Sequence, residues 1–494
     1  MSKTNLPAPP PNILFLMVDQ LRPDHAGFMP ESVYSTPRLR ELAGASTVFT
    51  NCQSVNPVCM PARAALLTGR YTHQIGTLAM SGDMFFDYPT YPQALQKAGY
   101  WTAHVGKLHI LQPWPWGQPR GEGVNLVSLA PEIKKLGFDW LWESSGKQLA
   151  GKNFCNWCEH LQAKGILEPV RDFLSACGAN HDMADDTLEP DGNPWPFDEA
   201  DHVDVVTGDN ALRALRDRPR DQSFYLKVSF CSPHKPFDPP QRYLDAEPCE
   251  EVDDFTPGPD GRELDPGLKK TLWRLRRAYR ATLRLVDDQI GRILDELRDQ
   301  DALDNTLIVF TGDHGEMMGD HGRVQKQIYY RESLTVPTLI RHPRHARTRV
   351  YPHPVELTDL TATLLDAAGL DPQEALSEPW PAYRDRIPCQ SLLPALEDDA
   401  PLRDFSFSES GNGWCCMQSA TRKYVRWTLP TESEGFREEF YDIVNDPRER
   451  HNLSENPDEE AERLRHRAAL EWRLASTPSA QRTWAPYGGG SAGT

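Results

Sequence analysis

A cysteine near the start of the chain occupies a position where a thiol can do chemistry. Cys59 lies in the segment NPVCMPARAALLTGRYTHQIG (residues 56–76), two residues before Pro61 and four before Arg63. The Ala- and Leu-rich residues 62–70 predict a helix that begins near Pro61, because proline is well suited to a first helical turn. A helix N-terminus lowers a thiol pKa, which suits an anion site or a reactive cysteine. The alternative is a buried, inert cysteine.

Clusters of polar residues follow four short apolar segments elsewhere in the chain. Residues 13–18 lead into Asp19-Gln20, residues 100–105 into GKLH, residues 224–230 into SPH, and residues 306–310 into GDHG. Apolar segments that alternate with helical patterns in this way are typical of buried parallel strands. In such sheets, ligands bind beyond the carboxyl ends of the strands, so the polar clusters predict one site at that edge.

These segments indicate an α/β fold. Residues 272–297 carry an apolar stripe at helical spacing, which predicts a long crossover helix before the segment at 306–310. Residues 111–200 are rich in Pro, Trp, Gly and charge, and they predict a variable insertion near the site. This insertion would belong to a catalytic domain of residues 1–390.

The chain beyond residue 390 has a different pattern. Residues 405–408, 423–427 and 439–443 predict short antiparallel strands, and residues 457–475 predict a charged helix. We therefore expect residues 391–494 to form a small α+β subdomain, in which the tail YGGGSAGT is disordered.

Composition favours a globular protein and excludes some partners. The 494 residues are 39% hydrophobic and 25% charged, with a net charge of −18. That charge argues against nucleic acid or an anionic membrane as the main partner. The first apolar segment is too short for a signal peptide, and no segment approaches a membrane span in length. The ten cysteines lack the spacing of a disulfide framework, so we expect free thiols in a cytoplasmic protein.

Five short motifs occur in a fixed order along the chain. Cys59 to Arg63 reads C-x-P-x-R and is continued by TGRY at 68–71, and GYWT at 99–102 is followed by GKLH. The other motifs are Asp19-Gln20, Pro233-His234, and DHG at 313–315 with Lys326 downstream. Together they resemble the type I, formylglycine-dependent sulfatases of the alkaline phosphatase superfamily, with leucine at 108 where tryptophan is common. The likeness covers about residues 11–370, and FYDIVNDPRERHNL near the end resembles the family's closing strand.

The resemblance implies a fold and a reaction. The fold is a large, mixed, mostly parallel sheet sandwiched by helices, with a smaller C-terminal domain that has a short antiparallel sheet. The reaction is hydrolysis of a sulfate monoester. Cys59 would be oxidised to formylglycine by a sulfatase-modifying enzyme, and the hydrated aldehyde would attack sulfur and later release sulfate. A small-molecule or sugar sulfate ester is the expected substrate.

The resemblance also implies a divalent metal held by oxygen-rich ligands. The ion is expected to be Ca²⁺, or Mg²⁺ or Mn²⁺ in a tighter site. The implied ligands are Asp19, Gln20, Asp313, His314 and the modified Cys59. Many sulfatases carry a second aspartate at the position of Gln20, so ligation there stays open, and Asp19 has a turn or capping role as its alternative.

Five further residues acquire roles by resemblance. Arg63 would steady the nucleophile or the metal ligands, and Lys107 and Lys326 would supply positive charge to the sulfate oxygens. His109 would take a proton from the hydrated aldehyde, while His234 would bind sulfate and help to protonate the leaving oxygen. A turn residue at His234 and a solvated lysine at Lys326 are the simpler alternatives.

Several alternatives remain at this stage. The same site could hydrolyse phosphonate monoesters or phosphodiesters, or it could belong to a non-catalytic anion-binding protein in which Cys59 is never modified. Cys155, Cys158, Cys177 and His181 have metal-ligand residue types, and they form either a structural zinc site or a set of unliganded thiols. A homo-oligomer is compatible with the sequence.

Overall fold

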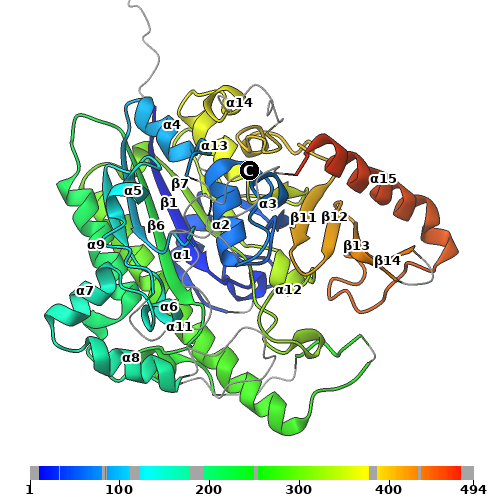
Figure 1. Cartoon of the computed structure of the whole chain (residues 1–494), viewed down its shortest axis with the longest axis horizontal. Coiled ribbons are helices and arrows are strands. Elements are labelled where there is room, and N and C mark those ends of the chain that lie inside the picture. Colours follow the sequence, from blue (N-terminus) through cyan, green and yellow to red (C-terminus); the bar gives the residue numbers. More distant parts are fainter. Residues whose placement is uncertain are drawn as a thin grey trace, which may run out of the picture.

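Eight strands of the described chain form one large sheet, which lies in the left-hand part of Figure 1. The computed structural model describes residues 10–32, 34–80, 84, 86–111, 123–177, 193–249, 254–259, 261–345, 347–377, 387–431 and 435–479. In spatial order, the strands are β5 (Trp140–Glu143), β4 (Trp101–Gly106), β6 (Phe224–Pro233), β1 (Asn12–Asp19), β7 (Thr306–Gly312), β8 (Thr338–Arg341), β2 (Thr47–Phe49) and β9 (Arg349–Tyr351). β8 is antiparallel to both neighbours, and the other pairings are parallel. The predicted mixed, mostly parallel sheet is therefore confirmed.

Helices cover both faces of this sheet (Figure 1). One face carries α1 (Pro37–Ala43), α9 (Val203–Asp217) and α11 (Pro266–Asp299), and the other carries α2 (Cys59–Thr68), α4 (Tyr91–Lys97) and α13 (Asp359–Ala367). α11 contains the predicted long helix and leads into β7. The remaining helices are α3 (Thr72–Ile75), α5 (Ala130–Lys134), α6 (Lys147–Ala150), α7 (Asn156–Ala163), α8 (Leu167–Ala176), α10 (Gln241–Ala246), α12 (Arg331–Leu334), α14 (Pro372–Ala375) and α15 (Glu460–Ser476). Single turns of 3-10 helix are η1 (Pro23–His25), η2 (Glu199–Asp201), η3 (Leu303–Asn305), η4 (Asp320–Gly322), η5 (Pro394–Leu396) and η6 (Pro457–Glu459).

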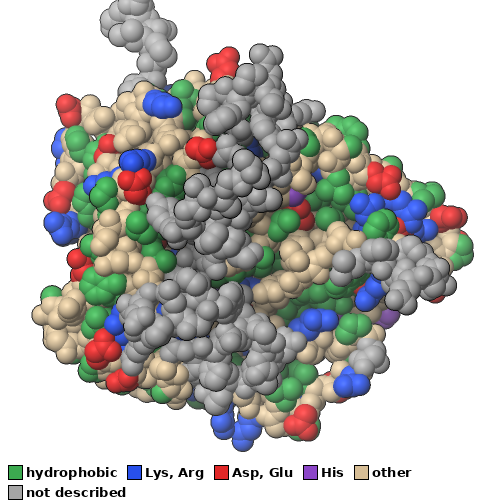
Figure 2. All heavy atoms as spheres, in the orientation of Figure 1, with side chains coloured by type: hydrophobic (Ala, Val, Ile, Leu, Met, Phe, Trp, Pro, Cys, Tyr) green, Lys and Arg blue, Asp and Glu red, His purple; other side chains and the backbone are tan. Residues whose placement is uncertain are grey.

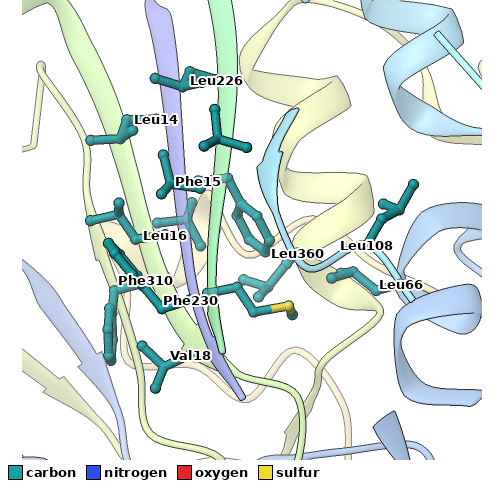
Figure 3. Close-up of a cluster of buried hydrophobic side chains, with 14 of the residues drawn as sticks. Leu14, Phe15, Leu16, Val18, Leu66, Leu108, Leu226, Phe230, Phe310 and Leu360 are labelled. Atoms are coloured by element: carbon teal, nitrogen blue, oxygen red, sulfur yellow. The ribbon is translucent and has the colours of Figure 1, made fainter. Parts of the chain in front are cut away.

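The core lies on both sides of the central strands. In β1, Phe15 points toward Leu66 of α2 and Leu360 of α13, whereas Leu14 and Leu16 point to the opposite side (Figure 3). All five side chains are fully buried. A strand that is buried on both faces reads as a continuous apolar segment, which explains why these strands were recognisable in the sequence.

The segment predicted as a variable insertion contributes to the main sheet. β5 pairs in parallel with β4 and forms one edge of the sheet, and α5 to α8 lie in the same segment. β5 was not predicted, because it has only four residues and gives no readable period. Trp114 and Trp116 of this segment lie outside the described residues, whereas Trp195 is buried.

A second sheet follows near the C-terminal end of the chain. It contains β11 (Ser406–Ser410), β12 (Trp414–Gln418), β13 (Arg422–Thr431) and β14 (Gly435–Asp442), paired antiparallel in sequence order. β12 was not predicted, and the other three strands overlap the predicted ones. α15 packs against this C-terminal sheet, as Figure 1 shows. A separate two-stranded sheet joins β3 (Cys52–Gln53) to β10 (Val355–Glu356).

Three further features concern the described ranges. Each helix within them is too short or too polar to cross a lipid bilayer. On the face drawn in Figure 2, the coloured acidic and basic side chains are interspersed, and both kinds gather over α15. The ten cysteines are all free thiols, as predicted.

Candidate active site

The predicted polar residues come together at the carboxyl ends of four neighbouring strands. Asp19 is the last residue of β1, and Asp313 follows β7 directly. Lys107 follows β4, and His234 follows β6. Because the order across the sheet is β4-β6-β1-β7, these four strand ends are adjacent.

Asp19, Asp313 and His314 form a buried group at this edge. His314 Nε2 lies 3.9 Å from Asp19 Oδ1 and 3.8 Å from Asp313 Oδ1. His314 Nδ1 lies 2.9 Å from the Gly315 carbonyl oxygen, so Nδ1 donates a proton there and Nε2 keeps a free lone pair. Burial opposes the charge of Asp19, but Lys107 and Arg63 outweigh it and hold its pKa well below the usual range.

Arg63 holds the strand ends together from the first turns of α2. Its Nε donates to Asp313 Oδ2 at 2.7 Å, and its Nη1 donates to Ser229 Oγ at 2.9 Å and to the Lys107 carbonyl oxygen. The guanidinium is fully buried, and its carboxylate neighbours keep its pKa above the usual value against the effect of burial. It therefore fixes β7, β6 and β4 relative to the helix that carries Cys59.

Cys59 lies in the first turn of α2 and is 3% exposed. Its Sγ is 4.0 Å from Lys326 Nζ, and it can form a compact group with Asp19 and His234, whose ligand atoms lie within 4.8 Å of one another. Burial raises the pKa of the thiol, but Lys326 and Lys107 more than compensate and bring it to about 7. Cys59 therefore differs from an inert buried cysteine.

Lys107 extends into the same group. Its Nζ lies 2.5 Å from Asp19 Oδ2, and this contact raises its pKa against the opposing effect of burial. Glu143, at the end of β5, accepts a hydrogen bond from the Leu108 backbone N–H at 3.1 Å. This hydrogen bond fixes the turn after β4. Lys107 therefore reaches the site even though residue 108 is leucine instead of the tryptophan that is common in the family.

The two predicted histidines are neutral groups near these cations. Burial, followed by the nearby Lys107, lowers the pKa of His109 well below its usual value. Both ring nitrogens of His109 are buried without a hydrogen-bond partner among the described residues. Burial and Lys326 likewise lower the pKa of His234, whose Nδ1 is 2.9 Å from the Lys235 carbonyl oxygen. That contact leaves His234 Nε2 free for a ligand.

Gln20 lies at the site in a left-handed conformation, with φ of 64°. Its backbone N–H donates to Asp313 Oδ1 at 2.9 Å, and its side-chain Oε1 accepts from Lys326 Nζ at 2.6 Å. Its Nε2 donates to Glu316, which fixes the orientation of the amide. The side-chain oxygen Oε1 of Gln20 therefore faces the site, but it already accepts a hydrogen bond from Lys326.

Comparison with known proteins identifies the family. The family model described as Sulfatase matches residues 11–370. The chain belongs to the sulfatase family. Membership makes it a sulfuric ester hydrolase, as the resemblance of the five motifs predicted.

Relatives of this sulfatase match over nearly the whole chain. The arylsulfatase of Clostridium perfringens is 29% identical over 485 residues, with 92% of this chain and 92% of that protein covered. The choline-sulfatase of Rhizobium meliloti is 28% identical, with 90% and 83% covered. The crystal structure of the phosphonate monoester hydrolase of Agrobacterium radiobacter has a similar fold, with a TM-score of 0.73 at 23% identity over 95% of this chain and 96% of that one.

The acidic group of this sulfatase fits a divalent cation. Asp19 Oδ1 and His314 Nε2 are buried acceptors that receive no hydrogen bond from the described residues. Asp19, Asp313 and His314 can bring their ligand atoms within 4.8 Å of one another. Two carboxylates and an imidazole nitrogen suit a divalent ion, and carboxylate oxygens suit Ca²⁺, Mg²⁺ or Mn²⁺.

Arg63→Lys is expected to lower kcat/KM of this sulfatase for an aryl sulfate about 10²-fold, because one ammonium group cannot reach Asp313, Ser229 and the Lys107 carbonyl together. Steady-state kinetics and thermal unfolding measure the effect. Arg216→Lys, on the exposed side of α9, is the control and should leave both unchanged. Wild-type kinetics in Arg63→Lys would show that positive charge alone suffices at this position.

Three residues that support the site were not predicted from the sequence. Glu316 orients Gln20, Ser229 accepts from Arg63, and Glu143 fixes the turn at Lys107. Glu316 directly follows DHG and could have been found from that motif. A polar Ser229 within an apolar strand was a weaker signal, and Glu143 had none.

The candidate zinc ligands are not brought together in the described part of the sulfatase. Cys155 Sγ and Cys158 Sγ are 3.6 Å apart, but Cys177 Sγ instead accepts a hydrogen bond from Asn193. His181 lies outside the described residues. No third ligand meets Cys155 and Cys158 within those residues.

Proposed function

We propose that this sulfatase hydrolyses a sulfate monoester to an alcohol and inorganic sulfate, with formylglycine derived from Cys59 as the nucleophile. The observation that carries the proposal is that Cys59 Sγ lies 4.0 Å from Lys326 Nζ and groups with Asp19 and His234, while Asp19 pairs with Lys107 and also groups with Asp313 and His314. A formylglycine-generating enzyme is then a required partner.

The cationic side chains suit a tetrahedral anion. Lys107, Lys326 and Arg63 all act electrostatically on Cys59 or Asp19 in this buried site. Lys107 and Lys326 would each donate to a sulfate oxygen, and the low-dielectric surroundings strengthen these contacts. Arg63 would keep Asp313 and the turn at Lys107 in place while the anion binds.

Asp19, Asp313 and His314 would hold the metal, with Gln20 Oε1 and the modified Cys59 as further ligands. The metal, which we propose is Ca²⁺ with Mg²⁺ or Mn²⁺ as alternatives, supplies Lewis acidity, and formylglycine supplies a nucleophile that releases sulfate without attack of water on sulfur. Glu316 would keep the Gln20 amide oxygen directed into the site.

The two neutral histidines suit proton transfer. Neither ring nitrogen of His109 has a hydrogen-bond partner among the described residues, so the ring can accept a proton from the nucleophile. His234 is held through Nδ1, and its Nε2 can contact the ester oxygen; once Nε2 has taken up a proton from solvent, the imidazolium can pass that proton to the leaving alcohol. Their lowered pKa values keep both rings able to accept a proton at neutral pH.

A second candidate reaction is hydrolysis of phosphonate monoesters or phosphodiesters at the same site. The similarity of fold to a phosphonate monoester hydrolase favours it, and a tetrahedral anion would meet the same cations. A non-catalytic, unmodified anion-binding protein is the less favoured reading, because the buried acceptors and cations around Cys59 suit turnover.

A panel of esters that share one nitrophenol leaving group tests the reaction. We expect kcat/KM for the aryl sulfate to exceed that for the phosphate monoester, the diester and the phosphonate by at least about 10²-fold. The enzyme should come from its native host or from a host that also expresses the modifying system. Faster turnover of the phosphonate or the diester would reassign the reaction. Choline sulfate and a sugar sulfate, assayed by sulfate release, then separate small-molecule from sugar substrates.

A further inference from the structure

Lys326 lies on a loop whose backbone is strained on both sides. The residues that flank it, Gln325 and Gln327, have φ values of 66° and 78°. A left-handed, non-glycine residue is strained and persists only where surrounding contacts hold it. The loop therefore needs contacts that keep Lys326 in place.

Two of these contacts are made by residues that lie shortly before Lys326 in the chain. The Met317 backbone N–H donates to the Gln325 carbonyl oxygen at 2.7 Å, and the Gln325 N–H donates to Glu316. These bonds hold the residue before Lys326. They do not reach Gln327, which follows it.

The C-terminal sheet holds the residue after Lys326. Trp414 Nε1, at the start of β12, donates to the Gln327 carbonyl oxygen at 3.1 Å. Asn412, in the turn between β11 and β12, donates from Nδ2 to Gln327 Oε1 at 2.7 Å. Lys423 of β13 donates to the Tyr329 carbonyl oxygen at 2.9 Å. Three side chains of one sheet thus bind the same short loop.

Aromatic packing supports these hydrogen bonds. The Tyr329 ring makes edge contacts with Trp414, at 5.7 Å between centroids, and with Trp427, at 6.0 Å. Trp414 is fully buried, so its indole N–H has no water to bind in place of Gln327. In Figure 1 the C-terminal sheet lies beside α12, which follows this loop.

Lys326 itself contacts residues of the proposed active site. Lys326 Nζ donates to Gln20 Oε1 at 2.6 Å and lies 4.0 Å from Cys59 Sγ. A change in the backbone at Gln327 would therefore move the ammonium group relative to Cys59 and the bound anion.

We propose that the C-terminal sheet positions Lys326 for the reaction, with the Trp414 indole N–H as the main positioning group. The inference rests on the proposed function, in which Lys326 binds the sulfate oxygens. Trp414 touches neither substrate nor metal; it acts through Gln327 and is a positioning residue.

Trp414→Phe tests this inference, because phenylalanine keeps an aromatic ring but removes the N–H donor. We expect kcat/KM for the aryl sulfate to fall about tenfold, as for loss of one buried hydrogen bond. Trp427→Phe is the matched control. Its indole N–H donates to Glu439 at 3.0 Å in the same sheet, and its ring contacts the same tyrosine, but it does not bind the Gln327 backbone. We expect it to stay within twofold of wild type.

A double-mutant cycle separates positioning from general stability. In a Lys326→Met background, Trp414→Phe should change kcat/KM by less than twofold, because the group it positions is gone. Asn412→Ala is a second variant on an exposed turn, where folding is not at risk, and a smaller loss of about threefold is expected. That loss should also disappear in the Lys326→Met background.

Three results would overturn the inference, and they are distinguishable. Equal effects of Trp414→Phe and Trp427→Phe would mean that the indole N–H has no special role. An equal loss with and without Lys326 would assign Trp414 to stability alone. Undiminished activity of Lys326→Met would remove Lys326 from the proposed function, and the positioning role would fall with it.

Discussion

Cys59→Ala is expected to abolish turnover, lowering kcat by about 10⁵-fold or more, while the protein still folds. The residue supplies the precursor of the proposed nucleophile, and no other described thiol has its pKa lowered by Lys107 and Lys326. Alanine suits the first turn of α2 and removes only one sulfur atom, so the stability cost is about 1 kcal/mol. Aryl sulfate kinetics and thermal unfolding measure the two effects.

Cys52→Ala is the matched control for this variant. Cys52 is also buried, but burial raises its pKa to about 12, and its charged neighbours are Asp359, Glu356 and Arg403, with no lysine among them. It should lose some stability and keep its activity. Mass spectrometry of the Cys59 peptide from active wild-type enzyme should show formylglycine. An active enzyme with only unmodified cysteine, or turnover by Cys59→Ala, would refute the assignment of the nucleophile.

Asp313→Asn is expected to weaken metal binding and activity together, with kcat reduced about 10³-fold. Asp313 Oδ2 accepts from Arg63, and Oδ1 accepts from the backbone N–H groups of Gln20 and His314. An asparagine amide at this position lacks the negative charge that balances Arg63. Its NH₂ group would also face one of these hydrogen-bond donors in place of an acceptor oxygen. Calorimetric titration with Ca²⁺, Mg²⁺ and Mn²⁺ measures metal affinity independently of turnover.

Asp359→Asn provides the comparison, since Asp359 is another buried carboxylate that pairs with an arginine, Arg403. It lies outside the site, so stability should fall while metal affinity stays at the wild-type value. If Asp313→Asn bound metal and turned over substrate normally, the metal site would have to lie elsewhere.

The central strands could be predicted from sequence because helices cover both of their faces. β1 and β7 are almost wholly apolar and β4 and β6 are mostly so, and the polar residues after them mark the edge at which they end. β5 and β12 were missed, because four or five residues rich in Trp and Cys carry no period that distinguishes a strand from a loop. Their place in a sheet depends on pairing with distant neighbours.

The residues of the candidate site could be predicted more fully than the residues that orient them. Asp19, Cys59, Arg63 and Asp313 belong to motifs whose residue types follow from the chemistry. The residues that orient them, such as Glu316 for Gln20 and Trp414 for the loop of Lys326, make contacts that only the folded chain creates. A tryptophan in an isolated short strand looks like ordinary core, so its hydrogen bond could not be foreseen.

The distance along the chain between Asp19 and Trp414 has a consequence for biosynthesis. The proposed site depends on β1, which carries Asp19, and on β12, which carries Trp414. The whole chain between these two strands must therefore be made before the site is complete. A polypeptide still being translated has Asp19 and Cys59 early but lacks the support for Lys326 until β12 has been made. We expect nascent chains that end before β12 to be inert, and hydrolytic activity to appear only in chains that contain it.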